Sequence, residues 1–283
     1  MWYTALPTLI QTAVFMIAAI VIGRVVFGLQ ANYAENYSFT EAVVTKDNPA
    51  VLVRFAGMIG ALLVATFGSY WPTGAGIMAD AGSGTVALVG ALIALILSRY
   101  INDFVILHEV NNNKEVVENR NIAVAVVEFA TYLGTALIFI GGMRDPSHGI
   151  IYNLSWFVLG QVFLIGLSRL YSWFVPKVFE EIGKGNTACA LSLGGFLLSG
   201  AMVIGTLISG EANGWFGDTV KLLVCLIVWL AVMFVSKLAI DRVVIPGNRM
   251  VKEMVEDKNW GVGLVDCTAS IGITNVILMV HIS

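Results

Sequence analysis

Two carboxylates interrupt otherwise apolar runs of this chain, and they are the side chains best placed to do chemistry. Glu128 lies seven residues after Asn121, and Asp266 lies seven residues after Asn259. At 1.5 Å of rise per residue, both acids would sit about 10 Å inside their helices. A charge in a bilayer costs on the order of 3 kcal/mol or more, so each acid needs a partner or a function.

Two other apolar runs carry polar residues at nearly the same depth. These are Arg54 and Ser192, each six residues after an asparagine. One interpretation is a buried ion pair, in which Arg54 binds Glu128 or Asp266 and holds the helices in register. A second is a pair of acids that handles protons or cations, and a third is a small polar cluster that faces cytoplasmic water. Ser270 follows Asp266 by one turn on the same helical face.

The composition places these residues in a membrane. The chain is 58% hydrophobic and 12% charged, whereas soluble domains carry about 25% charged residues. Apolar runs of about twenty residues, the length that spans a bilayer, lie near 7–27, 49–70, 83–101, 121–142, 150–173, 186–209, 215–239 and 260–281. We therefore expect an all-α polytopic membrane protein with about eight transmembrane helices, in one integral membrane domain over 1–283.

The basic residues are distributed unequally between the two sides of this arrangement. Fourteen of the 16 lysines and arginines lie in or beside the segments that follow the first, third, fifth and seventh runs. The positive-inside rule places that side in the cytoplasm and both termini on the periplasmic or extracellular side. The first run lacks a basic leader and a cleavage site, so we expect a retained span. The net charge of −3 gives no indication of nucleic-acid binding.

Two kinds of sequence marker recur along the chain at nearly the same interval. Asparagines that precede apolar runs recur at nearly equal intervals, and they are Asn48, Asn121, Asn186 and Asn259. Pairs of a small residue and a cation recur near helix ends at similar intervals, and they are Gly23-Arg24, Ser98-Arg99, Ser168-Arg169 and Ser236-Lys237. Such a period is the signature of repeat architecture.

Each repeat is expected to be a hairpin of two helices that begins at its asparagine. The units run approximately over 1–30 (a half unit), 45–107, 115–178, 181–245 and 254–283 (a half unit). Because each unit crosses the membrane twice, the copies share one orientation and are parallel repeats. The chain then starts with a lone second helix and ends with a lone first helix. A closed ring would bring these two together as a fourth hairpin.

Structural roles explain both markers. An asparagine at a helix start accepts a hydrogen bond from a backbone N–H that is costly to leave unpaired in lipid. A cation near a helix end can extend its stem to the phosphate head groups. We therefore expect the four asparagines to be helix caps and the four cations to be interface anchors, with neither set in a catalytic role.

A family resemblance rests mainly on the third repeat. The segment Asn-Thr-Ala-Cys-Ala-Leu-Ser-Leu-Gly-Gly at 186–195 follows Glu-Glu-Ile-Gly-Lys-Gly at 180–185. Within tandem hairpins, it resembles the YjfL-like inner-membrane family, domain of unknown function family 350. The match is clearest over 181–240, fair over 115–178 and weaker over 45–107, where Pro49 and Arg54 depart from the pattern. The resemblance implies a bacterial inner-membrane protein without a known reaction, in the company of membrane-stress proteins of the phage-shock type.

The sequence lacks motifs for catalysis or cofactor binding. The three cysteines lie inside apolar runs without metal-ligand spacing, and the three histidines are far apart. Neither a nucleotide loop nor a nucleophile elbow is found. We therefore expect no enzymatic activity, no catalytic residue, no cofactor and no metal.

Two functions remain as hypotheses. The leading one is a membrane scaffold or envelope-stress partner in the cell inner membrane, whose partners are the lipid bilayer and either a homo-oligomer or peripheral membrane-stress proteins. The alternative is a small ion or solute transporter, linked to protons or cations, that uses Glu128 and Asp266. In a transporter, these acids should line a cavity that water can reach. In a scaffold, they should be paired and sealed.

Overall fold

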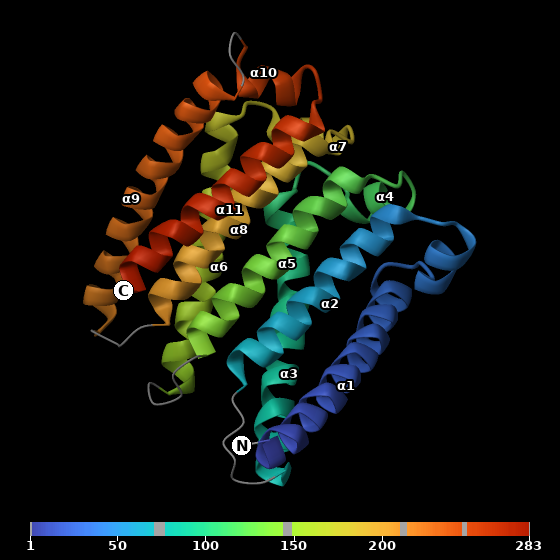
Figure 1. The fold of residues 1–283 in the computed structure, drawn as a ribbon. Coiled ribbons are helices and arrows are strands. Elements are labelled where there is room, and N and C mark those ends of the chain that lie inside the picture. Colours follow the sequence, from blue (N-terminus) through green and yellow to red (C-terminus); the bar gives the residue numbers. More distant parts are fainter. Residues whose placement is uncertain (1, 71–76, 144–148, 210–213, 245–247, 283) are drawn as a thin grey trace.

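Eight long helices account for most of the chain (Figure 1). The computed structural model describes residues 2–70, 77–143, 149–209, 214–244 and 248–282. In these ranges, eight helices are long and apolar enough to cross a membrane, which confirms the predicted fold class. They are α1 (Trp2–Ala34), α2 (Pro49–Ser69), α3 (Ile77–Ile101), α5 (Ile122–Met143), α6 (Ile150–Phe174), α8 (Thr187–Ile208), α9 (Gly214–Val243) and α11 (Trp260–Ile282). The turns expected near 72–76, 144–148 and 211–213 lie outside the described residues.

Short helices occupy polar segments that lie between the apolar runs. They are the π-helical turns η1 (Glu41–Thr45) and η2 (Asn102–Ile106) and the α-helices α4 (Asn112–Val117), α7 (Val178–Gly183) and α10 (Met250–Val255). The first helix also ends later than the apolar run near 7–27, because α1 continues to Ala34. Elements of five or six residues are too short for hydrophobic periodicity to reveal. In Figure 1, α4, α7 and α10 all lie at the same end of the bundle, which we call the short-helix face.

The first helices of the hairpins form a continuous row. Helix α2 packs against α5, α5 against α8, and α8 against α11. Helix α3 packs against both α2 and α5, and α6 packs against both α5 and α8, so each of these second helices fills the groove between two members of the row. Figure 1 shows α1 and α11 near opposite ends of this row. The closed ring that would bring them together within one chain is therefore wrong.

Each helix of the row begins after the same backbone turn. The asparagines that precede the row helices, Asn48, Asn121, Asn186 and Asn259, are called the row asparagines. Directly before each of them, after η1, α4, α7 or α10, lies a residue with positive φ, and these residues are Asp47, Arg120, Gly185 and Lys258. A left-handed residue ends a helix by turning the chain away from its axis. It costs least for glycine, so the aspartate, arginine and lysine at this place are held there by the surrounding contacts.

Glycines allow neighbouring helices of the row to approach closely. A Cβ atom built on Gly141 of α5 would collide with the carbonyl oxygen of Gly205 on α8, and one built on Gly205 would lie 2.6 Å from the Leu137 carbonyl oxygen. Small residues promote such contacts in membranes because helix association depends on packing rather than on the hydrophobic effect. The halves of α5 and α8 that lie farther from the short-helix face are therefore joined by backbone contact.

We predict that Gly141→Ala destabilises the protein by about 1–3 kcal/mol, because the added methyl group must push α5 and α8 apart. The measurement is unfolding in mixed detergent, followed by circular dichroism. Gly166→Ala is the matched control, since a Cβ atom at this exposed α6 glycine meets nothing within 4 Å. Equal stability of the two variants would contradict the close packing of α5 on α8.

Candidate functional site

Arg54 and Glu128 form a bidentate ion pair between α2 and α5. The Arg54 Nε donates to Glu128 Oε2 at 2.6 Å, and Nη2 donates to Oε1 at 2.9 Å. The Arg54 side chain is 1% exposed and the Glu128 side chain 0%. A fork-to-fork pair is strong and fixes the relative position of the two helices. Of the two pairings left open by the sequence, the structure contains Arg54 with Glu128.

A second guanidinium extends this pair towards the short-helix face. Arg99, at the end of α3, forms an ion pair with Glu35, and Arg54 Nη1 lies 3.5 Å from the same carboxylate. Arg99 Nε also lies 4.0 Å from Asp103 Oδ2. We call these five residues, Glu35, Arg54, Arg99, Asp103 and Glu128, the Arg54 junction. Burial raises the pKa of the Glu35 carboxyl, against the opposing effects of Arg99 and Arg54.

Backbone and amide groups complete the Arg54 junction. Arg54 Nη2 donates to the Asn112 carbonyl at 3.1 Å, and the Asn112 amide donates to Asp103 Oδ1 at 2.9 Å. The Asn113 amide donates to the Glu35 carbonyl at 3.1 Å. The short helix α4 is thus bound to α1, α2 and η2 through polar groups.

Asp266 has a different cation. Lys237 of α9 places its Nζ 2.6 Å from Asp266 Oδ2 and 2.8 Å from Oδ1. The Ser192 hydroxyl of α8 donates to the same carboxylate, and it also shares a hydrogen bond with the Tyr171 hydroxyl. The Lys237 ammonium lies 5.1 Å from the centre of the Tyr171 ring, within reach of a cation–π interaction. We call these four residues, Tyr171, Ser192, Lys237 and Asp266, the Asp266 junction.

The two junctions are related by one constant offset along the chain, which we call the half-chain offset. The same interval separates Arg54 from Ser192, Glu128 from Asp266, and Arg99 from Lys237. It also separates Asn48 from Asn186 and Asn121 from Asn259. The chain is therefore built from two halves, each with four long helices and one junction. The sequence interpretation treated the repeats as four equivalent units and missed this longer period, although these five intervals contained it.

At the contact between the two halves, the described residues of α5 and α8 do not form a charged pair. At the level of the two junctions, α5 has Val127 and α8 has Leu193, and both side chains are fully buried. Polar joints at α2–α5 and α8–α11 thus alternate with an apolar joint at α5–α8. Ser270 is buried one turn beyond Asp266, and the described hydrogen bonds of the Asp266 junction do not include it.

Three of the four row asparagines, Asn48, Asn121 and Asn186, connect successive repeats as well as capping their own helices. The Asn48 side-chain oxygen accepts from the Ala50 and Val51 N–H groups, while its amide donates to the carbonyls of Val116 and Val117 in α4. Each of the next two asparagines does the same one repeat further on. Asn121 donates to Ile182 and Gly183 at the end of α7, and Asn186 donates to Met254 in α10. The sequence interpretation foresaw the cap but not this second bond.

The four helix-end cations bind protein groups, so the expected role as head-group anchors is wrong for Arg99 and Lys237. Both pair with buried acids in the junctions. Arg169 donates to the Val105 carbonyl and contacts His108, and Arg24 donates to Thr40 at 3.1 Å. The bundle offers these cations nearer acceptors than the lipid phosphates. Lys237 was missed as the partner of Asp266 for this reason.

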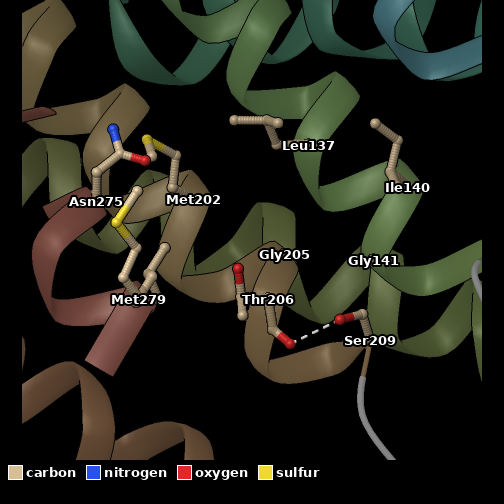
Figure 2. Close-up of a pocket in the computed structure, with 10 residues that line it drawn as sticks. Leu137, Ile140, Gly141, Met202, Gly205, Thr206, Ser209, Asn275 and Met279 are labelled. Atoms are coloured by element: carbon tan, nitrogen blue, oxygen red, sulfur yellow. Dashed lines mark hydrogen bonds between the residues drawn. The ribbon is translucent and has the colours of Figure 1, made fainter. Parts of the chain in front are cut away.

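The acids do not line the cavity of about 320 Å³ at the opposite end of α5, α8 and α11. Figure 2 shows its wall, which includes Leu137, Met202 and Asn275. Leu137 and Asn275 each lie nine residues beyond the acid of the same helix, about 13 Å along the axis. The cavity lining is mainly apolar, and Ser209 at its edge donates to the Thr206 carbonyl at 2.8 Å. This arrangement separates the cavity from both junctions.

The chemistry of the junctions is charge neutralisation. Glu128 and Asp266 are 0% and 1% exposed, and each accepts hydrogen bonds from a cation. This excludes the interpretation in which the acids face cytoplasmic water. Among the described residues, no group of three or more His, Cys, Asp or Glu side chains could hold a metal ion.

We predict that Arg54→Met destabilises the protein by about 3–5 kcal/mol, because it leaves Glu128 charged and unpaired. Arg54→Met combined with Glu128→Leu should regain most of this loss, since the unpaired carboxylate is then removed and Arg99 and Glu35 still pair with each other. The measurement is a double-mutant cycle from unfolding in mixed detergent. Additive effects of the two substitutions would contradict the direct pair. Ser192→Ala, at the equivalent position of the other half, should cost less because Lys237 still neutralises Asp266.

Comparisons with known proteins agree with this two-part architecture. A family model described as Domain of Unknown Function (DUF350) matches residues 1–143 and 146–280. The chain is also 27% identical to a UPF0719 transmembrane protein of Aquifex aeolicus (strain VF5) over 200 residues, which cover 66% of this chain and 70% of that protein. No solved structure matches the chain. The two matches nearly fill the described sequence, so this multi-pass membrane protein belongs to the DUF350 family.

Proposed function

We propose that the protein is a membrane scaffold without catalytic activity, and that it holds peripheral proteins at its short-helix face. The observation that supports this most is the state of the two intramembrane acids. Glu128 and Asp266 are paired with cations and sealed between helices. A group that must exchange protons or ions with water needs access to it, whereas a group that fixes helices does not.

The short-helix face has the surface that a peripheral protein requires. Exposed cations and anions are interspersed along its short helices and turns, and they include Lys114, Glu118, Lys177, Glu180, Lys184, Lys252, Glu256 and Lys258. Mixed charge of this kind favours a protein partner, because a surface of one sign would instead favour anionic lipid or nucleic acid. Under the positive-inside rule this face is cytoplasmic, in the inner membrane of the cell. Membrane-stress proteins are the partners that the family resemblance implies.

We predict that a photoactivatable amino acid at Lys177 or Lys252 captures protein in living cells. The same amino acid at Phe216, exposed at the other end of the bundle, is the control and should capture mainly lipid. The measurement is the mass shift of the purified protein after irradiation, followed by mass spectrometry of the adduct. Lipid adducts alone at Lys177 and Lys252 would contradict a scaffold that acts through this face.

A proton- or cation-linked transporter is the second candidate, and one observation favours it. The Tyr132 hydroxyl, the Asn102 amide and the Asn112 side-chain oxygen are buried without a described hydrogen-bond partner. Tyr132 and Asn102 lie close in the chain to Glu128 and Asp103, and the backbone carbonyl of Asn112 accepts a hydrogen bond from Arg54. Buried polar atoms of this kind are the usual hydrogen-bonding sites of internal water. A file of such waters could lead from Glu35 towards Glu128.

Proteoliposome flux discriminates between the two functions. We expect no proton or monovalent-cation flux above that of empty liposomes with the intact protein, because both acids are sealed by ion pairs. Flux that is present in the intact protein and lost in Glu128→Gln would instead establish transport. A variant at Glu180, an acid exposed on α7, controls for a general effect of lost negative charge.

A further inference from the structure

The last helix of the row has the position of α5 but lacks the neighbour that α5 has. The half-chain offset relates α5 to α11 and α2 to α8. Helix α5 packs between α2 and α8, so it is covered on both sides. Helix α11 packs against α8 and α9, and among the described residues no further row helix follows it. Helix α11 therefore exposes the side that corresponds to the side of α5 packed against α8 at the joint between the two halves.

Equivalent positions of the four row helices show the difference directly. The residues 9, 13 and 17 places after the row asparagine are buried in α2, α5 and α8, and they are Gly57, Ala61 and Ala65, then Ala130, Gly134 and Ile138, then Gly195, Ser199 and Val203. The same positions of α11 are Thr268, Gly272 and Val276, and all three are exposed. Val276 is 61% exposed, whereas Ile138 is 0% exposed.

The size of these residues indicates that α11 has a packing surface there. A Cβ atom on Gly134 would lie 3.1 Å from the Ala201 side chain of α8, so the position must be small for α5 and α8 to meet. Gly272 is the equivalent residue, and a Cβ atom there would meet nothing within 4 Å in the single chain. Contact with lipid alone does not require a small residue at this position.

The first helices of the chain present the complementary surface. Leu52 and Ala56 of α2 are exposed, whereas their equivalents on α8, Ala190 and Gly194, are buried against α5. In the adjoining helix α1, Met16 lies eight residues before the helix-end cation and is 39% exposed. The residues at the same distance before the later cations are Ala91, Gln161 and Trp229, which are 0%, 4% and 1% exposed.

The asparagine link is also incomplete at this end. Asn121 donates to Glu115 at 3.2 Å and to the carbonyls of Ile182 and Gly183 in the next repeat. Asn259 donates to Glu253 at 3.2 Å, and among the described residues it has no following short helix. Asn259 is exposed, whereas Asn121 is buried. The residues of η1 that correspond to Ile182 and Gly183 are Val44 and Thr45, both exposed.

We propose that these two ends bind each other between copies of the chain. Helix α11 of one copy packs against α2 and α1 of the next, and Asn259 donates to the carbonyls of Val44 and Thr45 in the neighbouring η1. The contact repeats the α5–α8 joint, and α1 of the second copy takes the place that α6 has there. Because α5 and α8 run in the same direction, the two copies have the same orientation in the membrane.

This interface is heterologous, since each copy contributes a different surface. Such contacts form a ring when the rotation closes and an open chain when it does not. The inference names one partner for the scaffold and in that sense rests on the proposed function, but its evidence comes from the repeat geometry alone. An array of this kind would present the short-helix faces of many copies side by side.

Disulfide cross-linking tests the register of the interface. In all three joints of the row, the residue nine places after one asparagine touches the residue eight places after the next, as Gly57 touches Phe129, Ala130 touches Gly194, and Gly195 touches Cys267. The same rule pairs Thr268 with Ala56 of the second copy. In a variant without the native cysteines, copies with Thr268→Cys mixed with copies with Ala56→Cys should form a cross-linked dimer in liposomes, and neither should cross-link alone.

A single chain with both substitutions should give a ladder of oligomers. Thr268→Cys combined with Val64→Cys is the register control, because Val64 lies eight residues, about 12 Å, further along α2. Gly272→Phe in the cross-linking background should lower the cross-linked fraction roughly tenfold, because the ring fills the groove for the second copy. Gly166→Phe, at an exposed glycine of α6 that also meets nothing within 4 Å, should leave the fraction unchanged.

Two results would overturn the proposal. One is a monomeric protein in which Thr268→Cys and Ala56→Cys do not cross-link, with lipid covering both ends. The other is cross-linking of Thr268→Cys with itself, which would indicate a symmetric dimer instead. Either result leaves capture at Lys177 unaffected, so failure of self-assembly and failure of the scaffold function can be distinguished. A Gly272→Phe protein with unchanged unfolding but lost cross-linking would show that the substitution acts on assembly rather than on folding.

Discussion

The bond from a row asparagine (Asn48, Asn121 or Asn186) to the next short helix is the interaction on which the arrangement of the repeats depends. A buried amide needs partners for both its oxygen and its N–H groups, and in a bilayer water does not supply them. Asn48 meets this need by capping its own helix with the oxygen and binding α4 with the amide. Each repeat therefore positions the next, and the spacing of the row follows from a local requirement that recurs along the chain.

The two junctions, which lie about one to two helical turns beyond the asparagine caps, add a second constraint. Both halves retain the acid, as Glu128 and Asp266, but the neutralising cation comes from different helices. In the first half it is Arg54 on the neighbouring row helix, and in the second it is Lys237 on the groove-filling helix. Arg99, which corresponds to Lys237, is released from this task and binds Glu35 instead. The fold thus fixes the place of the carboxylate more strictly than the source of its counter-charge.

The sequence predicted the eight spans well, because apolar runs near twenty residues long have few alternative structures. It offered the pairing of Arg54 with an acid as one of three interpretations, and it left Glu128 and Asp266 open as the partner. It did not predict the short helices α4, α7 and α10, whose length hides any periodicity. Nor did it assign Lys237 to Asp266, because a lysine near a helix end has two acceptable environments, head group or buried acid, and the choice depends on how α9 packs. The half-chain offset was present in the sequence, but equal treatment of all four asparagines concealed it.

The polar joints of the row, at α2–α5 and α8–α11, and its apolar joint, at α5–α8, constrain the pairing of helices differently. A buried ion pair contributes little net stability, because desolvation of both charges offsets most of their attraction, yet a mismatched pair is costly. The ion pairs of Arg54 with Glu128, between α2 and α5, and of Lys237 with Asp266, between α9 and α11, therefore favour correct pairing within each half. The apolar joint at α5–α8 carries no such restriction, since Val127 and Leu193 can pack against other side chains of similar size. An apolar joint of this kind can therefore also form between two copies of the chain. Val265 of α11 and Phe55 of α2, which are equivalent to Val127 and Leu193, are also apolar. The selectivity of assembly would then rest on the shape of small residues such as Gly272 and on the Asn259 amide rather than on charge.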